Sequence, residues 1–520
     1  MIILGIGGIL GDAASAVLKD GELVAAVEES KLVRRKLNWG GTGELPERSI
    51  ETCLQLAGAK PEQVDAVAVA RPVPKSDFYP KLRARFPNSR LLVVEHHLAH
   101  AASAYYASPF EEATVLTLDR GADFRCGSRW RAEGSRLTLE FEQYDSLGEL
   151  YGRVTSLLGF EANADEHKVQ WLSAAGDARF IELFNDIIGH DGEGARIDRS
   201  YLSNEHFSNG GFGERFYERL GIKPGAAIPE TLRPHIAAGL QRAIEAAVIR
   251  MAGEGKNLCF AGGLGLNALL VAALERHRNV FVQPVSGNAG TAIGAVLDTW
   301  HGAYGQTKRV PLRTLCLGPA SNAGEIKQAL ENCKLDFRYM LTHDELIETA
   351  VAQLSENKIV AWMQGRMEFG ARALGNRSIL ASPLDPYSTE NLNIFIKHRE
   401  QVRKFAASVP AELAAEYFET GPNARYLATV ARVKPAHREQ FATAIVADDL
   451  VRVHTVDRDE NPLYWRLLHA AGKKTGLPVL YNTSFNLFGE PLVCTPRDAV
   501  RSFYSSGIDA MFVGQFFLQK

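Results

Sequence analysis

Two histidines lie one helical turn apart in the stretch EHHLAHAASAYYA, residues 95–107. His96 and His100 are four positions apart, so in a helix their side chains point to the same side. Imidazole nitrogens placed in this way can both reach a single metal ion. Two histidines on an apolar helix are, however, more often a packed pair with backbone partners. The spacing alone therefore leaves a metal site and a packing role open.

Cations gather in two stretches of the C-terminal part, GRMEFGARALGNRSIL (365–380) and NIFIKHREQVRKFAASV (393–409). A solvated helix face would alternate such cations with Asp and Glu, whereas here they stand among glycines and core-forming residues. Arginine offers forked hydrogen bonds to phosphate, and lysine offers a point charge. The pattern predicts a partly buried pocket for a polyanion, with a merely charged surface as the alternative. The cations are Arg366, Arg372, Arg377, Lys397, Arg399 and Arg403.

Short polar side chains end the apolar run in PVLYNTSFNLFGEP, residues 478–491. Their small hydroxyl and amide groups suit the binding of phosphate, ribose or a small amide. An ordinary polar turn is the alternative interpretation. The residues concerned are Asn482, Thr483, Ser484 and Asn486.

Two glycine-rich turns follow strand-like runs, in NLCFAGGLGLNALL (257–270) and NVFVQPVSGNAGTAIGA (279–295). Gly262 and Gly263 leave room for a ligand to approach the backbone, and the N-terminus of the following helix attracts anions. A single turn of this kind would favour tight strand-to-helix packing. Two turns so close together favour a ligand site.

An arrangement of apolar strand, turn and hairpin occurs twice in the first half of the chain. MIILGI is followed by SAVLKDGELVAAVEE, and TVLTLD (114–119) by CGSRWRAEGSRLTLEFEQ, with turn signals inside each hairpin. The duplicated ATP-binding fold of the actin and Hsp70 type is built in this order. Residues 310–323 are rich in Pro, Gly, Ser and Asn, which suits a domain boundary.

Bulk composition limits the possible partners. The 520 residues are 46% hydrophobic and 23% charged, which suits two to four globular domains. A formal net charge of −3 with dispersed cations argues against a nucleic-acid partner. Six separated cysteines without a C-x-x-C pair indicate a reducing compartment. No apolar run reaches the roughly 20 residues of a membrane span, so we expect a cytoplasmic protein without a membrane partner.

The motifs, taken in order, resemble the NodU/CmcH family of O-carbamoyltransferases. The resemblance covers essentially the whole chain and rests on HHLAHAASA, LTLD, SLGELYGRVTSLLGF, DEHKV, AGGLGLN, GTAIGA, GRMEFGARALGNRSIL, IKHRE, NTSFN, GEPLVCTP and DAMFVG. It implies an α/β (mixed α+β) protein of two domains. Residues 1–318 would be a duplicated actin-like (ASKHA, RNase H-like) domain similar to the enzyme that installs threonylcarbamoyl on tRNA. Residues 319–520 would be a YrdC-like domain.

The resemblance also implies an activity. Carbamoyl phosphate and ATP, with Mg, would form carbamoyl adenylate in the YrdC-like domain. The transfer domain would then pass the carbamoyl group to a hydroxyl or amine of a small-molecule acceptor of secondary metabolism, such as antibiotic biosynthesis. In the family, positions matching Arg372, Arg377, Lys397, Arg399 and Arg403 and the NTSFN loop bind these substrates. Of these, Arg372, Lys397 and Arg403 are expected to be catalytic.

A metal site in the transfer domain follows from the same resemblance. In the family, the two helical histidines are joined by the Asp that ends the LTLD strand, here Asp119, and by an Asp of a G-D-x-G-T-A loop. Together they form an iron-type or other divalent site that binds the adenylate phosphate. Lys168, Asn267 and the turn at Gly262 and Gly263 are expected adenylate contacts. For Lys168 and Asn267, a packed lysine stem and a helix-start residue are the alternatives.

The sequence departs from the family pattern in the metal and acceptor sites. Asn288 replaces the fourth metal carboxylate, which removes a negative charge and should weaken divalent binding. Arg120 and Ala122 replace glycines of the D-G-x-G-E turn. Gly11 stands where the family has a histidine base, which leaves Asp12 as a polar contact or weak base. A second family histidine is replaced by Leu37.

Three hypotheses therefore stay open, and we expect the first. The chain is a carbamoyltransferase with an altered acceptor, an adenylate-forming enzyme with lost or redirected transfer, or a non-catalytic binding protein of a biosynthetic cluster. The sequence allows an oligomer and does not identify the acceptor.

Overall fold

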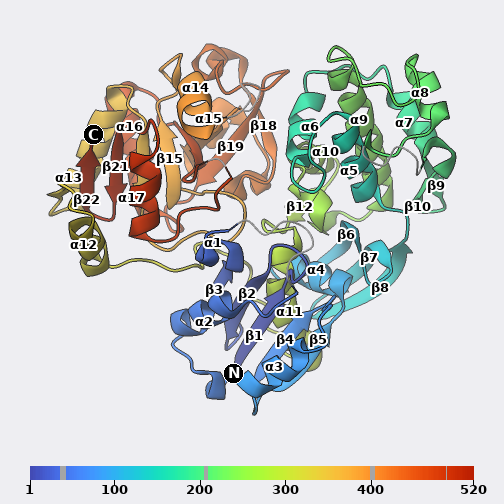
Figure 1. Ribbon diagram of the computed structural model, residues 1–520, viewed down its shortest axis with the longest axis horizontal. Coiled ribbons are helices and arrows are strands. Elements are labelled where there is room, and N and C mark those ends of the chain that lie inside the picture. Colours follow the sequence, from blue (N-terminus) through green and yellow to red (C-terminus); the bar gives the residue numbers. More distant parts are fainter. Residues whose placement is uncertain (36–42, 204–208, 399–403, 488) are drawn as a thin grey trace. The chain divides into compact units, whose positions relative to one another are not determined.

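The computed structural model describes residues 1–35, 43–203, 209–398, 404–487 and 489–520 (Figure 1). Contacts divide the chain into two compact units. Unit 1 comprises residues 1–12, 38–45 and 65–311, and unit 2 comprises residues 13–37, 46–64 and 312–520. The predicted domain boundary at 318/319 lies close to the 311/312 division, but the units are not continuous in sequence. The boundary and the YrdC-like assignment stay predictions.

Unit 1 contains parallel strands β1 (Ile2–Gly7), β4 (Ala66–Ala70) and β5 (Arg90–Val94), with β4 in the middle. Their side chains are almost continuously apolar in β1 and β4, as expected of strands buried on both faces. Helices α4 (His96–Tyr105) and α11 (Thr291–Asp298) cross in backbone contact. A Cβ added at Gly294 of α11 would lie 1.7 Å from the Ala99 carbonyl oxygen, so only glycine allows this crossing.

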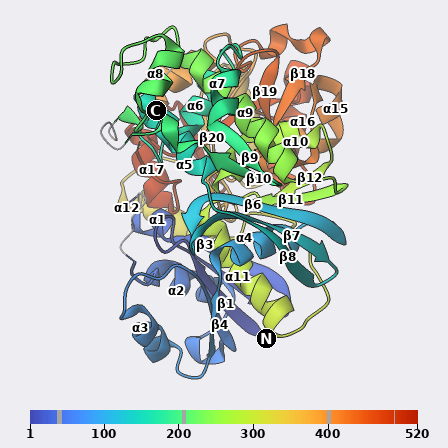
Figure 2. The same ribbon diagram turned by 90° about the vertical axis from the view of Figure 1, so that its right-hand side faces the viewer.

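The second sheet of unit 1 has the strand order β12-β11-β6-β7-β8. Strand β6 (Glu112–Ala122) pairs antiparallel with β7 (Arg125–Glu133), which pairs with β8 (Arg136–Gln143), and Figure 2 shows these long strands together. On its other side, β6 runs parallel to β11 (Asn257–Ala261), which is parallel to β12 (Asn279–Val282).

The predicted duplication is present in the order of elements. Strand β1 is followed by the hairpin β2 (Ala14–Lys19) to β3 (Glu22–Glu28) and then by the parallel strands β4 and β5. Strand β6 is followed by the β7–β8 hairpin and then by the parallel strands β11 and β12. Asp20 and Gly21 both have positive φ, 50° and 87°, as the expected tight hairpin turn requires. The prediction of a mixed α/β fold is confirmed, and the order of elements shows the predicted duplication.

The remaining helices of unit 1 lie between and after these strands. Glycine at 262 and asparagine at 267 precede α10, and a serine caps α5. The helices are α3 (Phe78–Arg85), α5 (Leu147–Leu157), α6 (Glu166–Ser173), α7 (Ile181–Ile187), α8 (Glu214–Leu220), α9 (Arg233–Met251) and α10 (Ala268–Glu275), with a small hairpin of β9 (Ile188–Asp191) and β10 (Gly194–Ile197).

Unit 2 is built on one extended sheet with the order β13-β22-β21-β14-β15-β20-β16-β19-β18-β17. The strands are β13 (Arg338–Tyr339), β14 (Val360–Met363), β15 (Arg377–Ala381), β16 (Ala406–Pro410), β17 (Phe418–Glu419), β18 (Val430–Val433), β19 (Leu450–Val456), β20 (Leu480–Ser484), β21 (Ala510–Val513) and β22 (Phe516–Gln519).

Helices cover both faces of this sheet. α13 (His343–Ser355) and α16 (Pro462–Thr475) pack on the face that includes Trp362 and Leu480. α12 (Ala323–Asn332) and α17 (Pro496–Tyr504) pack on the opposite face. The short α14 (Ser388–Asn391) and α15 (Ala414–Tyr417) lie in connections, and α1 (Glu29–Val33) and α2 (Glu47–Leu56) belong to the N-terminal segments of this unit.

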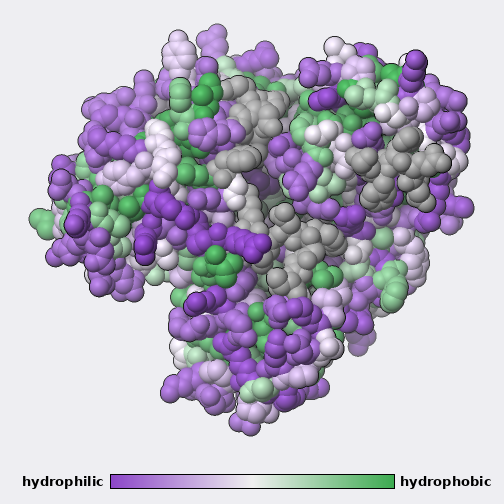
Figure 3. Space-filling view, in the orientation of Figure 1, coloured by the Kyte–Doolittle hydropathy of each residue, from purple (hydrophilic) through white to green (hydrophobic). Residues whose placement is uncertain are grey.

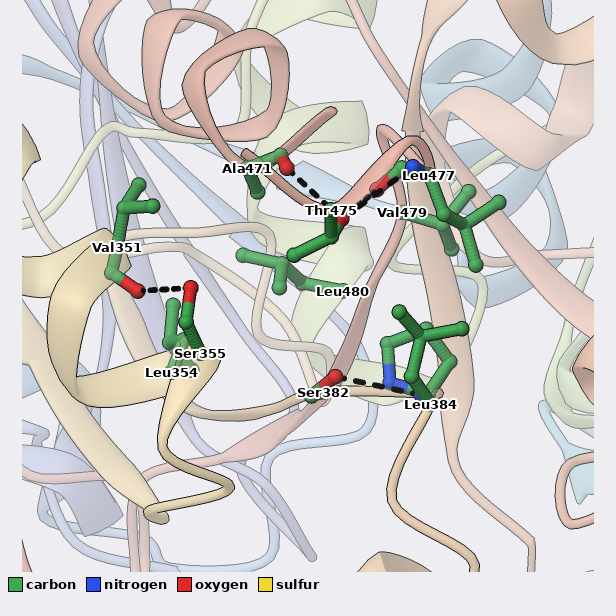
Figure 4. A pocket seen from close by; sticks show the side chains of 11 residues that line it. Val351, Leu354, Ser355, Ser382, Leu384, Ala471, Thr475, Leu477, Val479 and Leu480 are labelled. Carbon is green, nitrogen blue, oxygen red and sulfur yellow. Dashed lines mark hydrogen bonds between the residues drawn. The ribbon is translucent and has the colours of Figure 1, made fainter. Parts of the chain in front are cut away.

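No helix among the described residues is both long and apolar enough to cross a bilayer. On the face shown in Figure 3, hydrophobic residues form scattered groups among hydrophilic ones. A small pocket beside α13 and α16 is lined by aliphatic and hydroxyl side chains, of which Thr475 and Ser382 bond only to backbone (Figure 4). None of its described lining residues is ionisable, so it is not a catalytic candidate.

Candidate functional site

The structure brings together the predicted metal ligands of unit 1. His96 and His100 lie on the first turns of α4, and Asp119 lies near the end of β6. The Nε2 atoms of the two histidines are 3.0 Å and 3.3 Å from Asp119 Oδ2. All three residues are buried, and one ligand atom from each lies within 4.8 Å of the others.

The surroundings of these residues fit a divalent ion. His96 Nδ1 donates to the Arg71 carbonyl oxygen at 3.2 Å, while its Nε2 faces Asp119. With a metal ion bound, Nε2 would lose its proton and offer its lone pair as a ligand. Asp119 Oδ1 accepts a hydrogen bond from the Arg120 backbone N–H at 2.8 Å. Two imidazole nitrogens and a carboxylate oxygen form a donor set that iron or zinc accepts.

The pKa values of His96, His100 and Asp119 are shifted by burial and by their mutual hydrogen bonds. Burial opposes the charged form of Asp119, but hydrogen bonds from His100 and His96 hold its pKa well below the usual value. Burial lowers the pKa of His100, and the hydrogen bond that it donates to Asp119 only partly offsets this effect. For His96 burial is the largest single effect and opposes the charged form, but the hydrogen bond and charge of Asp119, with the Arg71 carbonyl group and the charge of Glu95, together raise the pKa. The Asp119 side chain is therefore an ionised carboxylate, which can bind either a protonated imidazole or a metal cation.

The neighbouring His97 is not part of this group. Its Nδ1 lies 2.9 Å from Thr117 Oγ1, and its Nε2 lies 3.2 Å from the Arg125 carbonyl oxygen. Burial lowers its pKa to about 3, so the ring is neutral and joins α4 to the β6–β7 hairpin. The packing role considered for histidines in this stretch is therefore performed by His97.

The glycine-rich turn at Gly262 lies directly against β6. Gly262 has φ +92°, and a Cβ there would be 2.2 Å from the Leu118 carbonyl oxygen. A Cβ at Gly263 would be 2.9 Å from Asp119 Oδ1, so this glycine lets the turn approach the metal group. The tight-packing interpretation thus accounts for Gly262, while Gly263 stands at the candidate site.

Asn288 begins a short helical turn, Asn288–Gly290, whose preceding residues contact the glycine turn. The Ser286 carbonyl oxygen accepts a hydrogen bond from the Gly262 N–H at 2.9 Å. Asn288 Oδ1 is buried and has no hydrogen-bond partner among the described residues. A buried, unsatisfied amide oxygen is a group that a cation or ligand would satisfy. Its predicted part in the metal site stays a prediction.

Three other predicted residues of unit 1 have local partners. Asn267 caps α10 by accepting from Leu270 N–H at 3.0 Å, and its Nδ2 donates to Gln241 at 2.8 Å. Lys168 forms an ion pair with Asp165 at 3.1 Å. Asp12 is exposed in the turn after β1, with φ +60°. The helix-start alternative describes the observed contacts of Asn267, and the ligand roles of all three stay predictions.

Two predicted cations of unit 2 are engaged by backbone carbonyl groups. Arg366 donates to the carbonyl oxygens of Gly318 at 3.0 Å and Val24 at 2.9 Å. The fully buried Arg377 donates to Gln364 O at 2.6 Å and also to Gly365 and Pro319 carbonyl oxygens. These contacts hold the loop in place, and binding of ATP by either side chain stays a prediction.

Glu368 shapes the loop that carries Arg372. Its Oε1 accepts backbone hydrogen bonds from Leu374 at 2.7 Å, Asn376 at 2.9 Å and Arg377 at 3.1 Å. The side chain is completely buried. Arg372, which is half-buried, lies in the loop folded around this carboxylate. Our sequence interpretation did not single out Glu368, although a lone acid among cations and glycines was a usable signal.

Lys397 joins the polar loop predicted from NTSFN. Its Nζ donates to Ser484 O at 2.6 Å, Asn486 Oδ1 at 2.8 Å and Asn486 O at 2.9 Å. Asn482 Nδ2 donates to the Ala373 carbonyl oxygen at 3.0 Å, which brings the same loop to the Arg372 segment. Thr483 is half-buried in β20 and pairs across the sheet with Ile379. Arg399, Arg403 and Leu37 lie outside the described residues.

Arg452 is a further cation that our sequence interpretation missed. It pairs across the sheet with Ala406, which also pairs with Asn482, so the three residues share one face of the sheet. Arg452 is half-buried, and its place beside the polar loop adds a third cation to the surroundings of Arg372 and Lys397. The alternation in β19 could have shown that Arg452 faces the same side of the sheet as His454, two residues further on, and the opposite side from the buried Val451 and Val453.

Comparison with known proteins gives the class of this fold and site. The family models "Carbamoyltransferase N-terminus" and "Carbamoyltransferase C-terminus" match residues 79–297 and 351–520. An uncharacterized protein of Synechocystis is 32% identical over all of this chain and 96% of its own length. Nodulation protein NolNO of Sinorhizobium fredii is 30% identical over 98% of this chain and 79% of its own. The chain belongs to the carbamoyltransferase family.

A further relative supports the narrower group. The 3'-hydroxymethylcephem-O-carbamoyltransferase of Amycolatopsis lactamdurans is 32% identical over 51% of this chain and 49% of its own length. Together with the nodulation protein, it places the chain in the NodU/CmcH group of carbamoyltransferases. The family resemblance inferred from the sequence motifs is confirmed.

Proposed function

We propose that this protein activates carbamoyl phosphate with ATP and Mg as carbamoyl adenylate in unit 2, and transfers the carbamoyl group in unit 1. The acceptor is a hydroxyl or amine of a small natural product. The observation that carries the proposal is the gathering of the Arg372 loop, Lys397 and the Asn482–Asn486 loop in unit 2. The family supports carbamoyl transfer in general.

Carbamoyl phosphate would lose inorganic phosphate to give carbamate. The carbamate, itself a poor acyl donor, would attack the α-phosphate of ATP to form carbamoyl adenylate and release pyrophosphate. Joining carbamate to AMP provides a good leaving group, and cations around the triphosphate and carbamoyl phosphate stabilise the charge that develops. Arg372 and Lys397 supply such charge, and Arg403 is proposed to add to it. Glu368 contributes by fixing the backbone of the loop that contains Arg372.

In unit 1, His96, His100 and Asp119 would hold a divalent ion of iron type, with Asn288 as a neutral fourth ligand. When bound, such an ion would neutralise the phosphate of the adenylate and favour departure of AMP. The Arg71 carbonyl group orients the His96 ring, and the Arg120 N–H orients the Asp119 carboxylate. Asn288 contributes no charge, so metal affinity is lower than with a carboxylate in its place.

A second candidate function, adenylate formation with lost or redirected transfer, is favoured by one specific feature. The turn after β1 holds Gly11 and the exposed Asp12, without an imidazole to take a proton from an alcohol. The first candidate accommodates the same feature with an acceptor that is an amine or a more acidic group, which would need no such base.

The test measures pyrophosphate release from ATP with and without carbamoyl phosphate. We expect release to require carbamoyl phosphate and to fall at least tenfold in Lys397→Ala, because a buried cation is lost from the polar loop. Lys327→Ala, which changes an exposed lysine of α12, is the matched control. Release independent of carbamoyl phosphate would overturn the proposal.

Transfer is measured separately. Extracts that contain candidate acceptors are incubated with the enzyme, ATP and carbamoyl phosphate, and carbamoylated products are detected by mass spectrometry. His96→Ala with His100→Ala should abolish the carbamoylated product while pyrophosphate release persists. Pyrophosphate release by the native protein without any carbamoylated product would favour the second candidate.

A further inference from the structure

His454 is a buried imidazole on the same sheet face as the polar loop of unit 2. It pairs across the sheet with Ser408, two residues from the Ala406 that pairs with both Arg452 and Asn482. Because side chains two residues apart point to the same face, these positions form one polar area. His454 is 4% exposed and Asn482 is 3% exposed.

The elements around this area bring its members together. Asn482 Nδ2 donates to the Ala373 carbonyl oxygen, and a Cβ at Gly375 would lie 2.2 Å from the Tyr464 ring. The Arg372 loop is thus packed between the strand of Asn482 and helix α16. The Tyr464 ring in turn lies nearly parallel to His454, with ring centroids 6.1 Å apart.

One contact of His454 bears on which ring nitrogen carries the hydrogen. Its Nδ1 lies 3.1 Å from Ser408 Oγ, a hydroxyl that can donate or accept. We assign Ser408 as the donor to Nδ1, which leaves the hydrogen of the neutral ring on Nε2. Burial lowers the pKa of His454 to about 3, which keeps the ring neutral at physiological pH.

The outer nitrogen of His454 is available to a ligand. Among the described residues, none forms a hydrogen bond with Nε2. Asn482 is complementary: its Nδ2 is engaged by Ala373, whereas its Oδ1 is buried and has no partner in the described part of the chain. The face therefore offers one N–H donor and one carbonyl acceptor, neither of which has a partner among the described residues.

A donor and an acceptor of this kind match a primary carbamoyl group, which has a carbonyl oxygen and an NH₂ on one plane. We propose that His454 Nε2–H binds the carbamoyl oxygen and Asn482 Oδ1 binds the carbamoyl NH₂, so that the pair selects the carbamoyl end of carbamoyl phosphate. The phosphate end lies toward Arg372 and Arg452. This inference rests on the proposed function and adds to it the residues that distinguish a carbamoyl group from an acyl group.

Binding without turnover tests the inference. Isothermal titration uses three probes: phosphonoacetamide, 2-oxopropylphosphonate, in which a methyl group replaces the NH₂, and inorganic phosphate. The native protein should bind phosphonoacetamide about tenfold more tightly than the methyl ketone, because a ketone leaves Asn482 Oδ1 unsatisfied. Equal affinity for the two would overturn the role of Asn482.

The variants isolate the histidine. His454→Phe keeps a planar ring but removes the donor, and should weaken phosphonoacetamide binding about tenfold with less than twofold change for phosphate. His454→Gln restores an N–H donor and should recover affinity to within about threefold. His469→Phe, on a half-exposed histidine of α16, is the matched control. Equal loss for phosphate and phosphonoacetamide would overturn the proposal.

A measurement on the native chain covers the case in which His454→Phe does not fold. In protein labelled with ¹⁵N-histidine, the signal that disappears in His454→Gln identifies His454. It should show protonated Nε2 and shift on addition of phosphonoacetamide but not of phosphate. An Nδ1–H form or an unchanged signal would contradict the assignment. A native protein that binds none of the probes would refute the proposed activation itself, whereas normal binding with an inert His454 refutes only this inference.

Discussion

Asp298 carries a carboxyl group whose pKa is shifted by burial. It lies at the end of α11, where burial raises the pKa of its carboxyl group to about 6. A folded-state pKa above the unfolded value means that the folded protein binds the proton more tightly. Stability therefore falls as pH rises from about 4 to about 6, and stays lower above that range.

Asp298→Asn should remove this pH-dependent cost. We expect the variant to be more stable than the native protein by up to about 3 kcal/mol at pH 7.5, with little difference at pH 4. Urea unfolding at the two pH values measures the effect. Asp344→Asn, at a largely exposed position, is the control and should leave stability unchanged. A gain of the same size at both pH values would contradict the explanation.

At the scale of elements, the Arg372 loop depends on one acid. Glu368→Ala would leave three backbone N–H groups without their acceptor, which costs about 1–3 kcal/mol for each group that remains buried and unsatisfied. Glu368→Gln keeps an acceptor oxygen and should be the milder change. Urea unfolding and limited proteolysis measure the two effects, with cleavage between residues 368 and 377 expected only in Glu368→Ala. Equal proteolysis of both variants would exclude this role.

The elements themselves were largely predictable from sequence, because their signals are local. The alternation and turns of β7 and β8, the buried run of β6 and the helical spacing of His96 and His100 depend on neighbours within a few residues. The engagement of Arg366 and Arg377 by carbonyl groups was not predictable, since a cation-rich sequence looks the same whether the acceptor is phosphate or backbone. Glu368 and His454 gain their roles only from partners brought together by the sheet.

At the scale of the molecule, unit 2 is held together by distant segments. Lys31 of α1 is 5% exposed, forms an ion pair with Glu28 at 2.9 Å, and donates to the carbonyl oxygens of Glu368 and Gly370 at 2.8 Å and 2.7 Å. The Gly370 N–H donates back to Glu28 at 2.8 Å. A segment near the start of the chain therefore supports the loop that carries Arg372.

Lys31→Ala should lower the free energy of unfolding by about 3–5 kcal/mol, because it leaves the Glu28 carboxylate buried without its counter-charge. Lys81→Ala, which breaks exposed ion pairs, should cost no more than about 1 kcal/mol. Guanidinium unfolding compares the two. Similar losses in both variants would show that the buried pair does not stabilise unit 2.

Because residues 13–37 and 46–64 belong with residues 312–520, the protein imposes an order on its own synthesis. The early hairpin and helices leave the ribosome without the partner that covers them. At about 5–20 residues per second, roughly 20 to 90 seconds pass before that partner is complete. During this interval the early segments of unit 2 lack residues 312–520. A gene divided near codon 318 would deliver a first product that holds all of unit 1 together with these segments, and a second product that lacks them.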